Sequence, residues 1–265
     1  MGRLKERFDS LKNNNKRALV SFISAYDPNL SISKKLLFAL PKAGADIIEV
    51  GLPFSDPMAD GPTIQKSSLR GIKSGFSVEK TFDMISSFRR EDNKTPIVFM
   101  GYFNTYYQFG LKQFFIQAKK NGVDGIIIVD LPPEEYNQLS NYEKKYKIDL
   151  IRLVTPTTDQ KRLKMILNNS SGFIYYVSIM GITGTKTPPL LKVKKSVKEI
   201  KKNTNLPVLV GFGVKNKSQI TQISKFADGA VIGSSLIKII EDSIKKKNKS
   251  EIIVKKVSSF VKSLK

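Results

Sequence analysis

Short apolar runs alternate with amphipathic stretches along most of this chain, and this alternation constrains the fold more than any other feature. Eight runs, rich in β-branched residues, occur in series: Leu19–Ile23, Ile47–Val50, Ile97–Met100, Ile126–Val129, Leu150–Val154, Phe173–Val177, Val208–Val210 and Gly229–Ile232. The runs are continuously apolar, which is typical of strands buried on both faces of a parallel sheet. Stretches with helical periodicity lie between them: Ser31–Ala43, Val78–Arg90, Leu111–Asn121, Glu134–Tyr146, Gln160–Leu167, Val193–Lys202 and Lys217–Phe226.

Strand–helix alternation of this kind predicts βαβ units with right-handed crossovers. Eight such units in 265 residues predict an α/β fold, a (β/α)8 TIM barrel that forms a single domain over residues 1–265. The helical spacing of Leu4, Phe8 and Leu11 predicts an extra N-terminal helix, and the tail after Glu241 predicts C-terminal helices. An open, doubly wound sheet is the alternative, although no Gly-x-Gly-x-x-Gly turn of a dinucleotide-binding fold follows the first run.

The chain has neither cysteine nor histidine, and this absence excludes several kinds of chemistry. Disulfides, thiol nucleophiles, Cys- or His-ligated metals and Ser-His-Asp catalysis all need one of these residues. Acid–base catalysis therefore has to use Asp, Glu, Lys or Tyr, and we expect no metal site. The apolar runs are far shorter than the ~20 residues that cross a bilayer. We expect a cytoplasmic protein without membrane contact, the plastid stroma being the alternative compartment.

The charge is strongly basic, with 45 Lys and Arg against 23 Asp and Glu and a net charge of +22. Such a charge points to nucleic acid or anionic membranes as partners. However, only 8 of the 45 basic residues are Arg, the residue whose planar fork best recognises bases and phosphates. The lysines are spread over the predicted helices, so we expect a solvated surface and no nucleic-acid partner. A basic nucleic-acid-binding protein stays as the alternative.

Two carboxylates near the second apolar run are candidate acid–base groups. Glu49 interrupts the run Ile47–Val50, where an ionised side chain costs free energy unless it faces a cavity or a partner. At the mouth of a barrel, burial would raise the pKa of Glu49 and suit it to proton transfer. Asp60 lies in the long segment that follows, where barrels build their active-site loops. A structural ion pair for Glu49 and a turn before Gly61 for Asp60 are the alternatives.

Glycines follow the last three apolar runs. Gly184 lies after the sixth run, Gly213 after the seventh, and Gly233 with Ser234 after the eighth. Glycine lets backbone N–H groups approach an anion closely, and a helix N-terminus adds a favourable dipole. Barrels often bind phosphate at the loops after strands seven and eight. These four residues therefore predict a phosphate site, with ordinary turn glycines as the alternative.

Aromatic and aliphatic side chains stand at or near the ends of the runs, where they could line a slot for a flat apolar ring. They are Phe22, Met100, Tyr102, Ile127, Val129, Leu153, Tyr175 and Phe212. Each of them is equally compatible with a packed barrel core. Tyr175 stands out because it lies inside its apolar run, where a phenol needs a hydrogen-bond partner, and Glu49 is the candidate.

One segment of the chain resembles a known protein family. Residues 49–65, Glu-Val-Gly-Leu-Pro-Phe-Ser-Asp-Pro-Met-Ala-Asp-Gly-Pro-Thr-Ile-Gln, look like the signature of the tryptophan synthase alpha subunit family. The similarity continues in order through Met100–Asn104, Asp130–Glu135, Gly181–Gly184, Gly211–Gly213 and Gly233–Ser234.

The resemblance implies a (β/α)8 barrel of tryptophan biosynthesis that cleaves indole-3-glycerol phosphate to indole and glyceraldehyde 3-phosphate in a retro-aldol step. It implies that Glu49 and Asp60 are the catalytic carboxylates and that Tyr175 is an active-site tyrosine. The positions matching those around the indole ring are Phe22, Tyr102, Ile127 and Phe212. The positions matching phosphate contacts are Gly184, Gly213, Gly233 and Ser234.

The resemblance also implies a partner, a beta subunit that carries pyridoxal phosphate (PLP) and receives indole through a tunnel in an alpha2beta2 heterotetramer. This chain itself is expected to need no cofactor. Ser55–Pro57, Asn104 and Pro132 match family positions near the beta subunit. A stand-alone lyase that releases free indole is one alternative. A chain that only activates the beta subunit is another, and the intact Glu49 and Asp60 argue against it.

Overall fold

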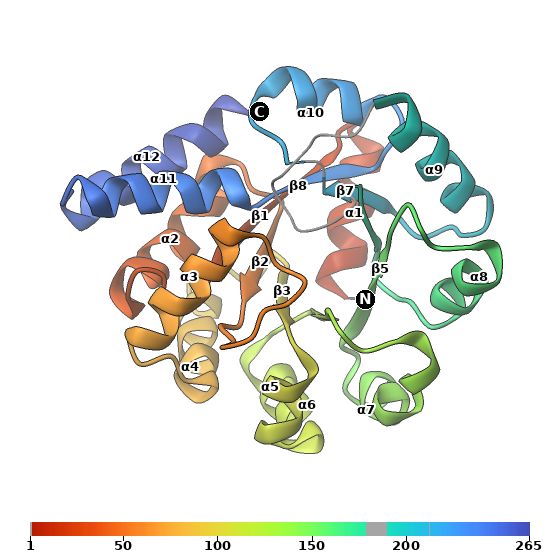
Figure 1. Cartoon of the computed structure of the whole chain (residues 1–265), viewed down its shortest axis with the longest axis horizontal. Coiled ribbons are helices and arrows are strands. Elements are labelled where there is room, and N and C mark those ends of the chain that lie inside the picture. The colour runs from red at the N-terminus through yellow and green to blue at the C-terminus, as the bar shows by residue number, and fades with distance from the viewer. Residues whose placement is uncertain (1, 179–189, 212) are drawn as a thin grey trace.

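The computed structural model describes residues 2–178, 190–211 and 213–265, and within them eight parallel strands close into a barrel (Figure 1). Each strand pairs with the next in sequence, and the eighth pairs back with the first. The strands are β1 (Ala18–Ser24), β2 (Ile47–Gly51), β3 (Ile97–Gly101), β4 (Gly125–Ile128), β5 (Asp149–Val154), β6 (Ile174–Val177), β7 (Val208–Gly211) and β8 (Gly229–Ile232). The predicted TIM barrel is therefore confirmed, and the open doubly wound sheet is wrong.

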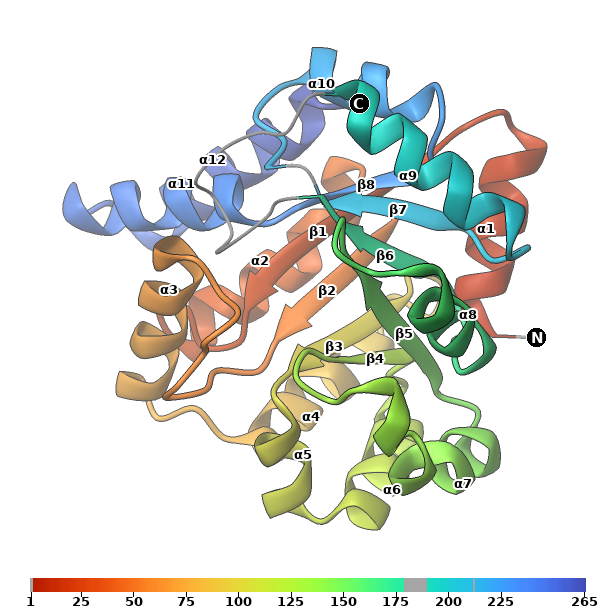
Figure 2. The same cartoon turned by 45° about the vertical axis from the view of Figure 1, so that its right-hand side comes forward.

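Helices surround this barrel (Figures 1 and 2). They are α1 (Arg3–Asn13), α2 (Leu30–Ala43), α3 (Pro62–Lys73), α4 (Val78–Arg89), α5 (Phe103–Phe109), α6 (Leu111–Asn121), α7 (Asn137–Tyr146), α8 (Gln160–Asn168), α9 (Leu190–Lys202), α10 (Lys217–Ser224), α11 (Ser234–Lys245) and α12 (Ser250–Ser263). The short 3-10 helix η1 (Pro133–Glu135) precedes α7, so the helix expected from Glu134 starts with a tighter turn. Helices α3 and α5 are additions that the periodicity of the sequence does not predict.

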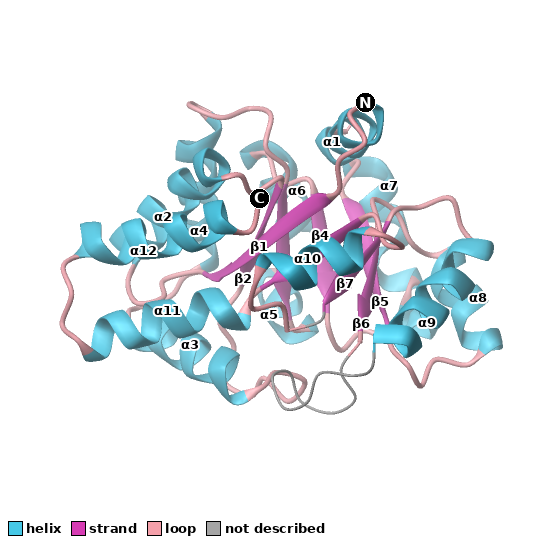
Figure 3. Cartoon of the chain, turned by 90° about the horizontal axis from the view of Figure 1, so that it is seen from above, coloured by secondary structure: helices cyan, strands magenta, loops and turns pink. Residues whose placement is uncertain are grey.

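Helix α1 lies at one end of the barrel (Figure 3). Its residues Leu4 and Phe8 are buried in the same cluster as residues of the barrel interior, among them Val20 of β1. The ring of Phe8 meets that of Phe173 edge to face at 5.9 Å between centroids. Arg3 of the same helix donates through Nη1 to Asp124 Oδ1 at 2.6 Å, just before β4 begins. The interior is thus closed by apolar packing at the end where the strands start.

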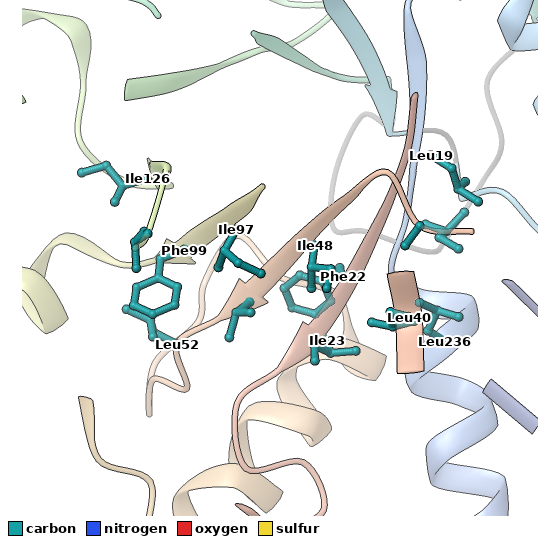
Figure 4. Close-up of a cluster of buried hydrophobic side chains, with 14 of the residues drawn as sticks. Leu19, Phe22, Ile23, Leu40, Ile48, Leu52, Ile97, Phe99, Ile126 and Leu236 are labelled. Atoms are coloured by element: carbon teal, nitrogen blue, oxygen red, sulfur yellow. The ribbon is translucent and has the colours of Figure 1, made fainter. Parts of the chain in front are cut away.

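A second apolar layer fills the space between the outside of the strands and the helices. Figure 4 shows part of this layer, in which Ile48 of β2 belongs to the same buried cluster as Leu40 of α2 and Leu236 of α11. The C-terminal helix α12 packs against α2 and buries a face of three residues, Ile253, Val257 and Val261. The helices of the described residues include none that is both long enough and apolar enough to span a membrane.

Candidate active site

Glu49 lies in the middle of β2, beside Phe22 of β1 in the strand register. Its side chain is only 1% exposed, and Oε2 has no hydrogen-bond partner among the described residues. Burial, with a smaller contribution from the negative charge of Asp60, raises the pKa of Glu49 to about 8. At neutral pH the Glu49 carboxyl therefore holds a proton that it can donate.

Asp60 lies in the loop between β2 and α3, where local contacts fix the backbone. Its N–H donates to the Pro57 carbonyl at 3.0 Å, and Gln65 Nε2 donates to the Asp60 carbonyl at 2.8 Å. Gly61 follows as the N-cap of α3, and Pro62 occupies its first turn, a position that suits proline. Burial raises the pKa of Asp60 to about 6, although the hydrogen bond from Tyr102 acts in the opposite direction. Asp60 is thus mostly ionised at neutral pH.

Tyr102 connects Asp60 to the end of β3. Its hydroxyl donates to Asp60 Oδ2 at 3.1 Å and accepts the Ala59 N–H at 3.0 Å. The ring stacks on Phe54 at 5.2 Å between centroids, so Tyr102 contacts both Phe54 and the Ala59–Asp60 part of this loop. Burial and the nearby Asp60 charge raise the pKa of Tyr102, which keeps the hydroxyl protonated as a donor.

Two glycines leave room for the aromatic side chains at the mouth of the barrel. A Cβ atom at Gly211 would lie 2.7 Å from Tyr175 Cε2, and one at Gly51 would lie 2.6 Å from Phe22 Cζ. Either contact is shorter than carbon atoms tolerate, so a side chain at either position would displace the neighbouring ring. Burial, followed by the charges of Glu49 and Asp60, raises the pKa of Tyr175 well above its usual value.

One cavity at the C-terminal ends of the strands brings most of the predicted site residues together. Its lining comprises Phe22, Glu49, Asp60, Ile64, Met100, Tyr175, Val177, Gly211, Gly213, Val231, Gly233 and Ser234. An adjoining pocket is lined by Tyr102 together with Phe22, Asp60 and Met100. The carboxylates and the tyrosines are thus placed around a predominantly apolar space.

The side of the cavity formed by β7 and β8 is suited to an anion. Gly213 has a φ of +63°, and Gly233 is the N-cap of α11, of which Ser234 is the first residue. The first N–H groups of a helix have no intrahelical acceptor, and the helix dipole favours negative charge there. Gly213, Gly233 and Ser234 all line the cavity that contains Glu49, so an anion at α11 would border the same cavity as the carboxylates.

Three predicted residues are not among the described residues that line these two pockets. Gly184 and Phe212 lie outside the described residues. Ile127 is fully buried in the barrel interior, in the cluster that contains Leu4, and it does not line the cavities at the mouth. That Ile127 borders the ring stays a prediction based on the family resemblance. Val129, two residues further along and therefore on the same side of the chain, lines the pockets next to Asp60.

Ile64 and Val177 also line the cavity, although the sequence analysis did not select them. Ile64 belongs to α3, whose first turn follows Asp60 directly, so a prediction of this helix would have found it. Within residues 2–178, 190–211 and 213–265 there is no cluster of three or more acidic side chains that could hold a metal ion. The cavity therefore offers a protonated carboxyl, an ionised carboxylate, an apolar slot and a helix end suited to an anion.

Comparisons with known proteins agree with this arrangement. A family model described as tryptophan synthase alpha chain matches residues 8–265. The tryptophan synthase subunit alpha of Legionella pneumophila str. Paris is 35% identical, with a TM-score of 0.91 over 100% of this chain and 97% of that chain. A structure from Aquifex aeolicus VF5 is 35% identical, with a TM-score of 0.89 over 100% of this chain and 98% of its own.

The tryptophan synthase of M. tuberculosis in its aminoacrylate-bound form is 29% identical, with a TM-score of 0.87 over 100% of this chain and 98% of that chain. The family model and the structural similarity both extend over almost the whole chain. This chain belongs to the tryptophan synthase alpha chain family, the lyases that cleave indole-3-glycerol phosphate.

Proposed function

We propose that Glu49 and Asp60 carry out the cleavage of indole-3-glycerol phosphate in this chain, with Glu49 as the proton carrier. The observation on which this proposal depends is the shared cavity, in which a buried carboxyl with a pKa of about 8 lies with a carboxylate with a pKa of about 6. Their different environments give the two carboxyl groups different pKa values, so that at neutral pH Glu49 is protonated and Asp60 is ionised. General acid–base chemistry at neutral pH requires such a pair.

The proton balance of the reaction needs only one carrier. The protonated Glu49 donates to C3 of the indole ring, and the resulting Glu49 carboxylate then takes the proton of the side-chain hydroxyl next to C3. The bond between C3 and the side chain breaks, its electrons neutralise the ring, and the hydroxyl carbon becomes the aldehyde of glyceraldehyde 3-phosphate. Glu49 ends the cycle protonated, as it began. Atoms are conserved, because overall one proton leaves the hydroxyl and one proton is added at C3, where the side chain was attached.

Asp60 has an electrostatic part in this scheme. Protonation of C3 leaves positive charge on the ring nitrogen, and an ionised carboxylate beside the N–H stabilises that charge more in the transition state than in the substrate. Phe22 and Met100 line the slot that would hold the ring, and Tyr175 borders it. The phosphate would bind at Gly213, Gly233 and Ser234, where α11 begins. Gly184 is proposed to add a contact on the strength of the family resemblance.

The test is indole release from indole-3-glycerol phosphate by Glu49→Gln and Asp60→Asn variants. We expect Glu49→Gln to lose at least ~10³-fold in kcat, because an amide cannot carry the proton. Asp60→Asn should lose ~10²-fold, since it retains the shape but loses the charge. Circular dichroism serves as the control for folding. Turnover by folded Glu49→Gln within a few-fold of the parent would overturn the proposal.

We propose a PLP-bearing beta subunit as the partner, in an alpha2beta2 heterotetramer, and expect no cofactor in this chain. Two apolar side chains near the mouth of the barrel support a partner surface there. Met58, 77% exposed, follows β2, and Tyr107, 60% exposed, lies in α5 after β3. Exposed apolar side chains that cluster around a site often mark an interface. The family match also favours an alpha subunit over a stand-alone lyase.

Mixing this chain with a beta subunit tests the partner. We expect a 1:1 ratio of chains by sedimentation and faster indole release than from the isolated chain. Met58→Asp should weaken the complex, while Ile252→Asp, at a 42% exposed apolar position on α12, should leave it unchanged. Equal activity with and without the beta subunit, and no complex, would favour the stand-alone lyase.

A further inference from the structure

Ser68 is a buried residue of α3 whose hydroxyl binds the loop that carries Asp60. Its Oγ accepts the Phe54 N–H at 2.7 Å and donates to the Phe54 carbonyl at 2.8 Å. One hydroxyl thus satisfies both backbone polar groups of Phe54, and Ser68 itself is only 5% exposed. Because Phe54 lies soon after the end of β2, Ser68 fixes the loop close to the point where it leaves the barrel.

The side chain of Phe54 links this anchor to Tyr102. The two rings are tilted by 22° to each other, and their centroids lie 5.2 Å apart. Stacked aromatic rings attract each other, and each restricts where the other can lie. The Tyr102 hydroxyl accepts the Ala59 N–H at 3.0 Å and donates to Asp60 Oδ2 at 3.1 Å. The place of the Asp60 carboxylate therefore depends on where the Phe54 ring lies.

The loop between Phe54 and Asp60 is held near both of its ends. Ser68 holds the first end. Tyr102 holds the second end together with Gln65, whose Nε2 donates to the Asp60 carbonyl at 2.8 Å. The two residues that follow Phe54 are exposed to solvent. If the first contact is lost, this exposed part of the loop has room to move, and the Phe54 ring moves with it.

Helix α3 is fixed to the barrel by other residues, which makes Ser68 a firm anchor. Asp27, only 1% exposed, follows β1 and accepts two hydrogen bonds from Arg70, through Nε at 2.6 Å and Nη2 at 2.8 Å. Ser67 donates to the same carboxylate at 2.5 Å. A two-point bond between a guanidinium and a carboxylate fixes direction as well as distance. The position of α3 therefore does not depend on the Ser68 hydroxyl.

We propose that Ser68 is a positioning residue for Asp60. Its hydroxyl keeps the Phe54 ring stacked on Tyr102, and this stacking keeps the Tyr102 hydroxyl on the Asp60 carboxylate. The proposal rests on the proposed function of Asp60, which is to stabilise positive charge on the indole ring. Ser68 acts through two side chains in series and takes no part in the proton transfers.

The titration of Asp60 reports whether this series of contacts is intact. Burial raises the pKa of Asp60, and the bond from Tyr102 lowers it, so a weaker bond moves the titration to higher pH. Other titratable side chains border the same cavities, and a change in the charge or position of any of them would also affect Asp60. With Tyr102 they are Glu49, Asp130, Arg152, Arg162 and Tyr175. Replacing Ser68 changes none of these groups, and it loosens the stacking behind Tyr102.

Carbon-13 nuclear magnetic resonance of the full chain, labelled at the aspartate carboxyl carbon, tests the proposal. The Asp60 signal is assigned by its loss in Asp60→Asn, and its midpoint is read from a pH titration. In Ser68→Ala we expect the midpoint to rise by roughly 0.3–0.5 pH unit, since the bond from Tyr102 is weakened but not removed. The acidic limb of kcat/KM for indole release should rise by the same amount.

Ser67→Ala is the matched control. It removes a neighbouring buried hydroxyl of the same helix, but one that binds Asp27 instead of the Asp60 loop. We expect a lower melting temperature and an unchanged Asp60 midpoint, because both bonds from Arg70 remain. An equal rise of the midpoint in Ser67→Ala and Ser68→Ala would overturn the proposal.

The double variant Ser68→Ala/Tyr102→Phe shows whether Ser68 acts through Tyr102. Tyr102→Phe removes the bond itself, so we expect the midpoint of the double variant to equal that of Tyr102→Phe alone. A further rise in the double variant, or no rise in Ser68→Ala alone, overturns the proposal. The carbon-13 signal does not depend on turnover, so failure here and failure of the Glu49→Gln assay are distinguishable.

Discussion

Glu49 and Asp60 face one cavity, yet their surroundings give them pKa values of about 8 and about 6. We predict a bell-shaped pH profile of kcat/KM for indole release. Activity should fall as the pH drops through about 6, because Asp60 gains a proton, and as it rises through about 8, because Glu49 loses one. Steady-state rates between about pH 5 and pH 9.5 measure both limbs. A profile that stays flat through pH 8 would contradict the acid form of Glu49.

Tyr102 is the side chain that holds Asp60 in its ionised form. Its hydrogen bond lowers the pKa of Asp60 against the effect of burial. In Tyr102→Phe we therefore expect the acidic limb to move upward by roughly half to one pH unit, since a bond to a charged group contributes ~1 kcal/mol or more. Tyr106→Phe is the matched control, because its buried hydroxyl donates to the Ile127 carbonyl at 3.1 Å. Equal shifts in both variants would argue against a specific effect on Asp60.

At the scale of elements, α1 is held to the barrel by a few apolar side chains. Phe8→Ala should lower the free energy of unfolding by ~3 kcal/mol, because it removes a buried ring that contacts Phe173. Urea unfolding measures this loss, and Leu191→Ala, at an exposed position, should change it by less than ~0.5 kcal/mol. Since α1 lies far from the mouth, kcat/KM should stay within about twofold of the parent. A large loss of activity with intact stability would contradict this separation.

The strands could be predicted from the sequence because continuous apolar runs leave little choice of structure. Helix α3 could not, since the residues that it buries are Ser67, Ser68 and Gly71 rather than large apolar ones. Ser67 hydrogen-bonds Asp27 at 2.5 Å, and a Cβ at Gly71 would lie 2.7 Å from the Ala25 carbonyl oxygen. Helix α3 packs through small and polar residues, so it lacks the apolar stripe by which an amphipathic helix is recognised in a sequence.

The candidate site shows a similar division. Glu49 was recognisable because it interrupts an apolar run, and Arg152 interrupts the run Leu150–Val154 in the same way without having been selected. The bond between Tyr102 and Asp60 joins residues 42 positions apart. It depends on how the loop before α3 folds back, which neither local propensity nor spacing encodes.

For the whole molecule, the charge of +22 should destabilise the compact state through repulsion between lysines. We predict that raising sodium chloride from ~20 to ~200 mM increases the melting temperature by about 2–5 °C, because salt screens exposed charges over this range. Differential scanning calorimetry measures the change. A steady decrease in melting temperature would mean that the ion pairs outweigh the repulsion. Binding to DNA with a steep salt dependence would instead revive a nucleic-acid role.

The apolar seal that α1 makes with Leu4 and Phe8 has a consequence for the order of events in a catalytic cycle. With that end blocked in the described structure, substrate would have to enter, and both products leave, by the opposite opening. Indole and glyceraldehyde 3-phosphate then compete for one exit. A protein seated over this exit would decide which product diffuses into water and which is passed on.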